Sequence, residues 1–161
     1  MPIDEAAFRQ AMGHFACGVT VVTTQTGRER NGLTVASFAS LSLRPPLILV
    51  CVEKSVKSHD AIVAAGKFAV NILAEDQTAI SNRFATKAED KFVDLPIHEG
   101  ELGLPLIDGA LANIECQLRD TLPGGDHSIF VGEVTAAEMR DGEPLLYFRS
   151  GYRKINPPSE S

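Results

Sequence analysis

The chain has 161 residues, of which 44% are hydrophobic, and its formal net charge at pH 7 is −6. This length suits one domain with a real core, and an acidic chain without a basic cluster argues against nucleic acid or an anionic membrane as partner. The longest apolar run, Pro45–Val52, is too short to span a bilayer, and the polar N-terminus is unlike a secretory signal.

The three cysteines, Cys17, Cys51 and Cys116, are scattered without a CxxC pair. An odd number of cysteines in apolar surroundings indicates reduced thiols and a cytoplasmic protein. The four histidines show no ligand spacing with each other or with the cysteines. The sequence therefore predicts no metal site.

The N-terminal region predicts a helix followed by a hairpin. Apolar residues at helical spacing over Ile3–Phe15, with Asp4 as N-cap, indicate an amphipathic helix that ends near Gly13. β-branched residues indicate a strand over Gly18–Gly27. A polar turn then closes on the pair Asn31-Gly32, which is typical of a hairpin.

The rest of the chain predicts more strands and two short helices. Strands are expected over Leu33–Leu43, Pro46–Glu53, Lys67–Leu73, Ala112–Leu122, His127–Arg140 and Pro144–Ile155. Helices are expected over Ser58–Ala65, with Ser58 as candidate cap and Gly66 as the stop, and over Glu75–Ala85. The prolines at 45 and 46 forbid one continuous ladder across the second and third strands.

These elements predict a mainly β protein, an antiparallel barrel or sandwich with short helical connections. There is no internal repeat, linker or low-complexity segment, so residues 1–161 form one domain, with a short, loose tail from about residue 156. The sequence has no nucleophile elbow, phosphate-binding glycine loop or HExxH motif. A cofactor would therefore have to carry the chemistry if the protein is an enzyme.

Leu33–Leu43 is an unusual strand because small hydroxyl residues interrupt an apolar run. Strand periodicity places Thr34, Ser40 and Ser42 on one face and Ser37 on the other. Small side chains would let a flat ligand lie against the backbone, whose polar groups could bond the ring edges. The alternative is a strand whose polar residues face water.

Other candidate site residues also have ordinary structural interpretations. A helix that opens at Ser58 beside two lysines would suit an anion, or is simply a capped helix. Phe84 and Phe92 are stackers or core residues, and Lys91 is a solvated charge. Tyr152 and Arg153 form a ligand wall or a strand end. The stretch GGDHSIFVGEV places His127 at a glycine-rich strand mouth, which is either a hairpin end or the rim of a ligand site.

Several segments together resemble the flavin reductase family, the small reductase components of two-component flavin-dependent monooxygenases. The segments are FRQAMGHFACGVTVVTT, NGLTVASFASLSLRPPLILVCV, KFAVNILAEDQ, RFA, KF, LPLIDGALANIECQL, GGDHSIFVGEV and PLLYFRSGYR, spread from Phe8 to Arg153. Each motif is weak alone, whereas their order and spacing are specific. The resemblance implies an antiparallel split β-barrel homodimer that binds FMN or FAD and oxidises NADH or NADPH.

The resemblance also implies which residues form the site. The flavin would contact Thr34, Val35, Ala36, Ser37, Ser40, Cys51, Val52, Lys57, Ser58 and Phe84, with Lys57 and Ser58 on the phosphate side. The nicotinamide would meet His127, Arg149, Ser150, Gly151 and Tyr152, and His127 would position it for catalysis. No metal is implied.

Three functions follow as hypotheses. The first is an NAD(P)H:flavin oxidoreductase that supplies reduced flavin to a partner monooxygenase. The second is a flavin-binding carrier or sensor without turnover, and the third is a reductase of another acceptor, such as a corrinoid or a ferric chelate. The GGDH and SGYR segments favour a nicotinamide pocket and hence the first hypothesis. The sequence leaves open FMN or FAD, NADH or NADPH, prosthetic or diffusing flavin, and the partner oxygenase.

Overall fold

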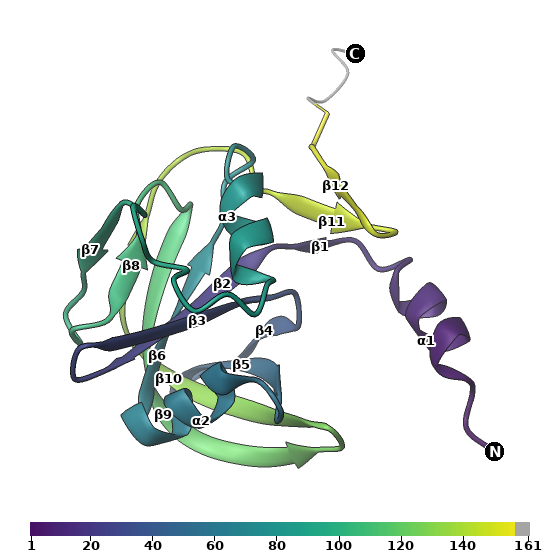
Figure 1. Cartoon of the computed structure of the whole chain (residues 1–161), viewed down its shortest axis with the longest axis horizontal. Helices are drawn as coiled ribbons and strands as arrows, with labels where there is room; N and C mark the ends of the chain where they lie inside the picture. The colour runs from purple at the N-terminus through teal and green to yellow at the C-terminus, as the bar shows by residue number, and fades with distance from the viewer. Residues whose placement is uncertain (157–161) are drawn as a thin grey trace.

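The computed structural model describes residues 1–156, and strands dominate them (Figure 1). One sheet contains seven strands, and each neighbouring pair runs antiparallel. In spatial order these are β3 (Glu29–Val35), β2 (Thr20–Thr26), β6 (Lys67–Ile72), β9 (Ala112–Gly124), β10 (His127–Met139), β5 (Pro46–Glu53) and β4 (Phe38–Leu43). Two small sheets comprise β1 (Cys17–Gly18), β11 (Leu146–Phe148) and β12 (Gly151–Arg153), and β7 (Ile97–Glu99) and β8 (Pro105–Ile107).

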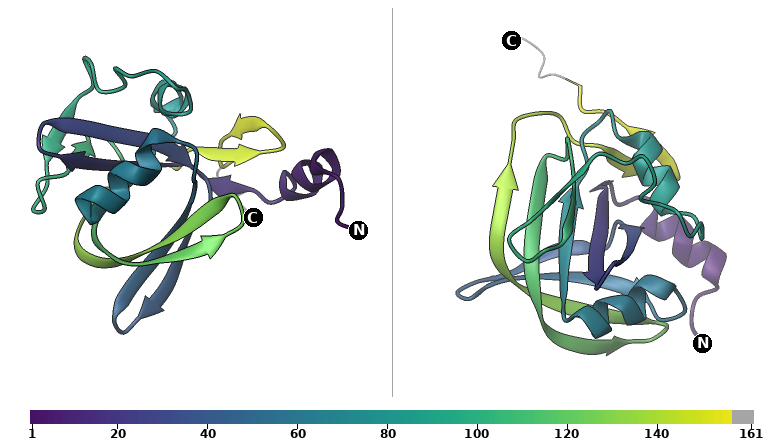
Figure 2. Two further views of the ribbon diagram at one scale, coloured as in Figure 1. Left: turned by 60° about the horizontal axis from the view of Figure 1, so that its bottom comes forward. Right: turned by 60° about the vertical axis from the view of Figure 1, so that its left-hand side comes forward.

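The large sheet curls into a barrel that is split between its edge strands. β3 and β4 lie at opposite edges of the sheet, yet only Ala36 and Ser37 separate them in the chain. The sheet must therefore bend round until its edges meet at this short linker, as the views in Figure 2 show. The predicted antiparallel split barrel is confirmed.

β2 is buried on both faces because it runs between two hydrophobic clusters. Val22 belongs to the cluster inside the barrel, together with Phe68 and Phe130. Val21 belongs to a second cluster outside it, which includes Phe84. The continuous β-branched run in the sequence reflects this burial on both sides.

The described residues contain three helices: α1 (Glu5–Met12), α2 (Lys57–Ala65) and α3 (Thr78–Phe84). The Asp4 side chain accepts a hydrogen bond from the Ala7 N–H at 2.9 Å, so the predicted N-cap of α1 is confirmed. Gly66 ends α2 in a left-handed conformation, as predicted. No helix within residues 1–156 is long and apolar enough to cross a membrane, and no cluster of metal-ligating side chains occurs there.

Two predictions about the first hairpin and the strand after it are wrong. The turn between β2 and β3 lies at Gly27 and Arg28, and Asn31-Gly32 pairs inside β3 opposite β2. The predicted single strand Leu33–Leu43 is two strands, because β3 pairs with β2 and β4 pairs with β5. The strand is interrupted at Ala36, where the chain passes from one edge of the sheet to the other.

Three boundaries also differ from the prediction. Val56, not Ser58, is the N-cap of α2, and Ser58 lies inside the first turn. The expected final strand over Pro144–Ile155 is a hairpin of β11 and β12, because Arg149 and Ser150 take positive φ values. The helix expected from Glu75 begins at Thr78. The loose tail was expected from about residue 156, and residues 157–161 lie outside the described part.

Candidate functional site

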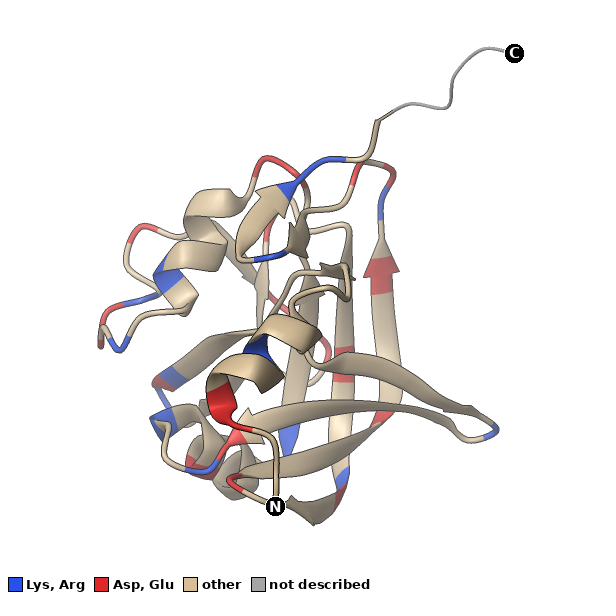
Figure 3. Cartoon of the chain, turned by 90° about the vertical axis from the view of Figure 1, so that its right-hand side faces the viewer, with Lys and Arg blue, Asp and Glu red and all other residues tan. Residues whose placement is uncertain are grey.

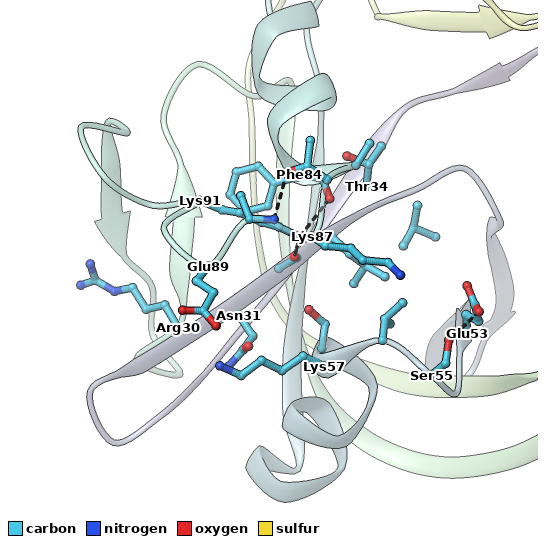
Figure 4. A pocket seen from close by; sticks show the side chains of 18 of the residues that line it. Arg30, Asn31, Thr34, Glu53, Ser55, Lys57, Phe84, Lys87, Glu89 and Lys91 are labelled. Carbon is cyan, nitrogen blue, oxygen red and sulfur yellow. Dashed lines mark hydrogen bonds between the residues drawn. The ribbon is translucent and has the colours of Figure 1, made fainter.

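A pocket of about 780 Å³ lies at the split of the barrel (Figure 4). β3, the linker after it, the end of β5 and the first turn of α2 form one side. The end of α3, the segment after it and the first residue of β10 complete the wall. Of the predicted flavin contacts, this pocket is lined by Thr34, Val35, Ala36, Ser37, Cys51, Lys57, Ser58 and Phe84.

The linker between β3 and β4 offers unpaired backbone donors to the pocket. Ala36 and Ser37 are exposed, and within residues 1–156 their N–H groups donate no hydrogen bond to the protein. The side chain of Val35 is buried in the barrel core. The linker therefore presents its backbone to a ligand, and two exposed N–H groups suit a ligand with acceptor atoms along one edge.

The hydroxyl groups of β3 and the linker are used within the protein. The Thr34 hydroxyl donates to the Ser81 carbonyl at 2.6 Å, and the Ser37 hydroxyl donates to the Cys51 carbonyl at 3.0 Å. Each hydroxyl has a single proton, so neither donates to a phosphate while these bonds exist. These bonds fix α3 to β3 and β5 to the linker, and the phosphate contact predicted for the strand hydroxyls stays a prediction.

The first turn of α2 lines the pocket with Lys57 and Ser58. In the part of the chain that the structure describes, the backbone N–H groups of Lys57 and Ser58 donate to no protein acceptor. Unpaired N–H groups and the helix dipole both favour negative charge there. The anion site predicted at this helix stays a prediction, and Ser58 is not the cap.

An ion pair crosses the mouth of the pocket beside this helix turn. The Lys57 ammonium lies 2.9 Å from the Glu29 carboxylate on β3. Their hydrogen bond and mutual attraction lower the pKa of Glu29 and raise the pKa of Lys57. Glu29 was not among the predicted site residues, because only the β2–β3 hairpin brings it opposite α2. An incoming anion would compete with Glu29 for Lys57.

Phe84 forms the wall behind β3 with its ring almost fully buried, at 1% exposure. It packs edge-on against Phe92, with ring centroids 5.1 Å apart. The Lys91 ammonium donates to the carbonyls of Gly32 at 3.0 Å and Phe84 at 3.3 Å. Burial lowers the pKa of Lys91. Lys91 is therefore not the solvated charge that was expected: it fastens the segment after α3 to β3.

His127 also lines the pocket, with 43% of its side chain exposed. Its Nδ1 lies 2.7 Å from the Asp126 carboxylate. This hydrogen bond lowers the pKa of Asp126. Gly125 takes a positive φ in the turn just before these residues, which only a glycine adopts easily. The arrangement orients the imidazole and leaves Nε2 for a ligand.

The remaining predicted site residues do not line the pocket. Val52 is fully buried in the barrel core, and Ser40 is exposed on β4. Arg149–Tyr152 form the β11–β12 turn and its second strand rather than the pocket wall. The Tyr152 hydroxyl contacts the Ser81 hydroxyl at 2.7 Å, so this segment reaches α3 but not the cavity.

Comparisons with known proteins agree with this fold. Residues 12–156 match the model of the flavin reductase-like domain. The reductase component of a 4-nitrophenol 4-monooxygenase/4-nitrocatechol 2-monooxygenase from Rhodococcus opacus is 42% identical, covering 97% of this chain and 84% of that protein. The NADH-dependent FMN reductase SmoA from Agrobacterium fabrum is 45% identical, covering 95% of this chain and 87% of that protein.

A solved structure shows the same fold. The NADH:FAD oxidoreductase SgcE6 from Streptomyces globisporus, in complex with NAD and FAD fragments, superposes with a TM-score of 0.93. Its sequence is 39% identical, and the match covers 98% of this chain and 96% of that chain. The chain therefore belongs to the flavin reductase family, and the family predicted from the sequence motifs is confirmed.

Gly32 is expected to be required for the pocket wall. A β-carbon at this position would lie 2.7 Å from Cε1 of Phe84 and 3.1 Å from the Val22 carbonyl oxygen. Overpacking of this kind costs about 1–3 kcal/mol. We expect Gly32→Ala to lower the free energy of unfolding in urea by that amount. Gly18→Ala is the matched control, because nothing lies within 4 Å of its β-carbon. Equal stability of the two variants would contradict this packing.

Proposed function

We propose that this flavin reductase transfers hydride from NADH or NADPH to FMN or FAD in the barrel-split pocket and releases reduced flavin to a partner monooxygenase. The observation that carries the proposal is the set of unpaired backbone donors on one pocket, from Ala36, Ser37, Lys57 and Ser58. A flavin mononucleotide has ring acceptors at one end and a phosphate at the other, which matches the two pairs. Relatives named as reductase components of monooxygenases support the same role.

In this proposal three groups that line the pocket have different tasks. Ala36 and Ser37 bind the acceptor edge of the ring, while Lys57 and the α2 N-terminus hold the phosphate. His127 uses its free Nε2 to orient the nicotinamide carboxamide. Hydride then passes from nicotinamide C4 to flavin N5, a step that needs alignment and no protein nucleophile.

The contacts predicted for Arg149–Tyr152 stay a prediction. These residues lie outside the pocket of a single chain, although Tyr152 touches α3, whose last residue, Phe84, lines it. Of the other functions considered, neither a carrier without turnover nor a corrinoid or ferric reductase gains a specific observation from the structure.

The experiment that tests the proposal separates nicotinamide binding from flavin binding. His127→Ala should raise KM for the nicotinamide roughly fivefold, the value of one hydrogen bond, and leave the Kd of FMN unchanged. Ser37→Ala should instead weaken FMN first, because it frees the linker from Cys51. Ser40→Ala is the control, since Ser40 lies on β4 away from the pocket. Stopped-flow reduction of FMN and fluorescence titration measure both constants.

Two outcomes would count against the proposal. The first is a protein that oxidises neither NADH nor NADPH in the presence of any flavin. The second is a His127→Ala enzyme that loses FMN as badly as Ser37→Ala does.

Glu29 is expected to weaken binding of the flavin phosphate. Glu29→Gln removes the carboxylate that holds Lys57 and leaves its ammonium for the phosphate. We expect FMN to bind roughly two- to fivefold more tightly, the range of exposed ion pairs, with the gain falling as salt rises. Riboflavin is the matched control because it has no phosphate, and its Kd should not change. If both ligands respond equally, Lys57 does not contact the phosphate.

We also propose that the protein is a homodimer. α1 buries no residue in its own chain, and it exposes Phe8 and Met12. The β4–β5 hairpin lies on the same face (Figure 3), exposes Leu41 and Leu43, and carries only Arg44 as a charge between its first residue and Val52. Two apolar projections on one face suit a second copy of the chain.

Light scattering tests this assembly. The mass should be near twice the 17.3 kDa of one chain at micromolar concentration, and Phe8→Lys should lower it to a single chain. Val63→Lys is the control, because Val63 is equally apolar and exposed but lies on α2. A monomeric wild-type protein would overturn the proposal.

A further inference from the structure

His59 is a largely buried histidine that lies beside the pocket lining without being part of it. It sits in the first turn of α2, and only 12% of its side chain is exposed. Its Nε2 lies 2.8 Å from the Ser128 hydroxyl of β10, and its ring centroid lies 5.1 Å from that of Phe130. Ser128 and Phe130 share the strand face that points into the barrel, so α2 closes this end of the barrel through His59.

The His59–Ser128 hydrogen bond joins two parts of the site. His59 directly follows Ser58, which lines the pocket, and Ser128 directly follows His127, which also lines it. Neighbouring residues in a helix turn and in a paired strand are held rigidly by their backbones. The bond therefore fixes the distance between the helix turn and the imidazole.

Other contacts at the same junction are made by the loop before α2. The Lys54 N–H donates to the Asp126 carbonyl at 2.9 Å, and the Lys54 ammonium donates to the Gly125 carbonyl at 2.8 Å. These bonds hold the β9–β10 turn against the loop. The His59 side chain makes a hydrogen bond from α2 itself to β10, inside the barrel.

The group resembles a nucleophile triad only in composition. His59 Nδ1 lies 2.9 Å from the Asp60 carboxylate, so a serine, a histidine and an aspartate are in line. Ser128 is only 4% exposed, however, and it points away from the pocket that His127 lines. No substrate carbonyl could reach its hydroxyl. The group can position other residues but cannot act as a nucleophile on a substrate.

We propose that His59 is a positioning residue for hydride transfer: its bond to Ser128 holds the α2 turn and His127 at the separation that aligns flavin and nicotinamide. This inference rests on the proposed function of the pocket. A small displacement between two bound rings strongly reduces the rate of transfer between them. The flavin phosphate meets the α2 turn and the nicotinamide meets His127, so neither ligand alone spans the two groups that the bond joins, and binding of each should change little.

The test uses variants that separate the hydrogen bond from the ring packing. His59→Phe keeps an aromatic ring against Phe130 and removes the bond, whereas His59→Gln keeps a polar group near the position of Nε2. In single-turnover stopped flow, His59→Phe should reduce the rate of FMN reduction about tenfold. The Kd of FMN and the KM for the nicotinamide should change less than about twofold. His59→Gln should recover most of the rate.

Ser128→Ala provides an independent variant that removes the same bond from the other side. It should slow FMN reduction as much as His59→Phe does, and the double variant should be no slower than either one. Val63→Ala is the control, because Val63 is exposed on α2 and does not belong to this group, and it should retain the wild-type rate. Urea unfolding of each variant shows that the folded state is populated under the assay conditions.

Three results would overturn the inference: a wild-type rate in both His59→Phe and Ser128→Ala, additive losses in the double variant, or a His59→Gln rate no better than that of His59→Phe. Failure of the wild-type protein to reduce any flavin would instead overturn the proposed function. The two failures are thus distinguished by the wild-type measurement alone.

Discussion

The passage of the chain between the two edges of the barrel is the constraint on which the site depends. β3 pairs with β2 at one edge and β4 pairs with β5 at the other, so the two residues between them belong to neither ladder. Ala36 and Ser37 are left with N–H groups that donate to no protein acceptor among residues 1–156. An exposed pair of donors on a rigid scaffold can bind a ligand readily, because no hydrogen bond within the protein must break when the ligand arrives.

The rest of the pocket is built around this linker by elements that carry little chemistry of their own. Thr34 and Ser37 donate their hydroxyl protons to backbone carbonyls, and Lys91 donates to two more. These bonds fasten α3, β5 and the segment after α3 to the pocket wall. α2 closes the barrel end and turns its N-terminus toward the same cavity, with Lys57 beside it. Polar side chains therefore shape the pocket, and backbone groups provide much of its binding capacity.

Much of the fold could be predicted from local sequence signals. The Asp4 cap, the Gly66 stop, the β-branched run of β2 and the alternation in β9 and β10 each report a local preference that the tertiary structure keeps. The antiparallel architecture follows from short connections between such strands. The family motifs added the split of the barrel, which local preferences do not specify.

The errors arise where tertiary contacts override local chemistry. Asn31-Gly32 has the sequence of a turn, but Phe84 packs against Gly32, and the strand therefore continues past it. Val52 lies between Cys51 and Glu53, which both line the pocket, yet strand alternation turns its side chain into the core. The pairing of Glu29 with Lys57 could not be predicted, because it depends on the β2–β3 hairpin that brings Glu29 opposite α2 rather than on any residue type.

A crystal structure of the protein with FMN is the decisive measurement. Acceptor atoms of the flavin ring are expected within hydrogen-bond distance of the Ala36 and Ser37 N–H groups. The phosphate is expected at the first turn of α2 beside Lys57. FMN bound at any other surface, with the linker N–H groups still facing water, would contradict it.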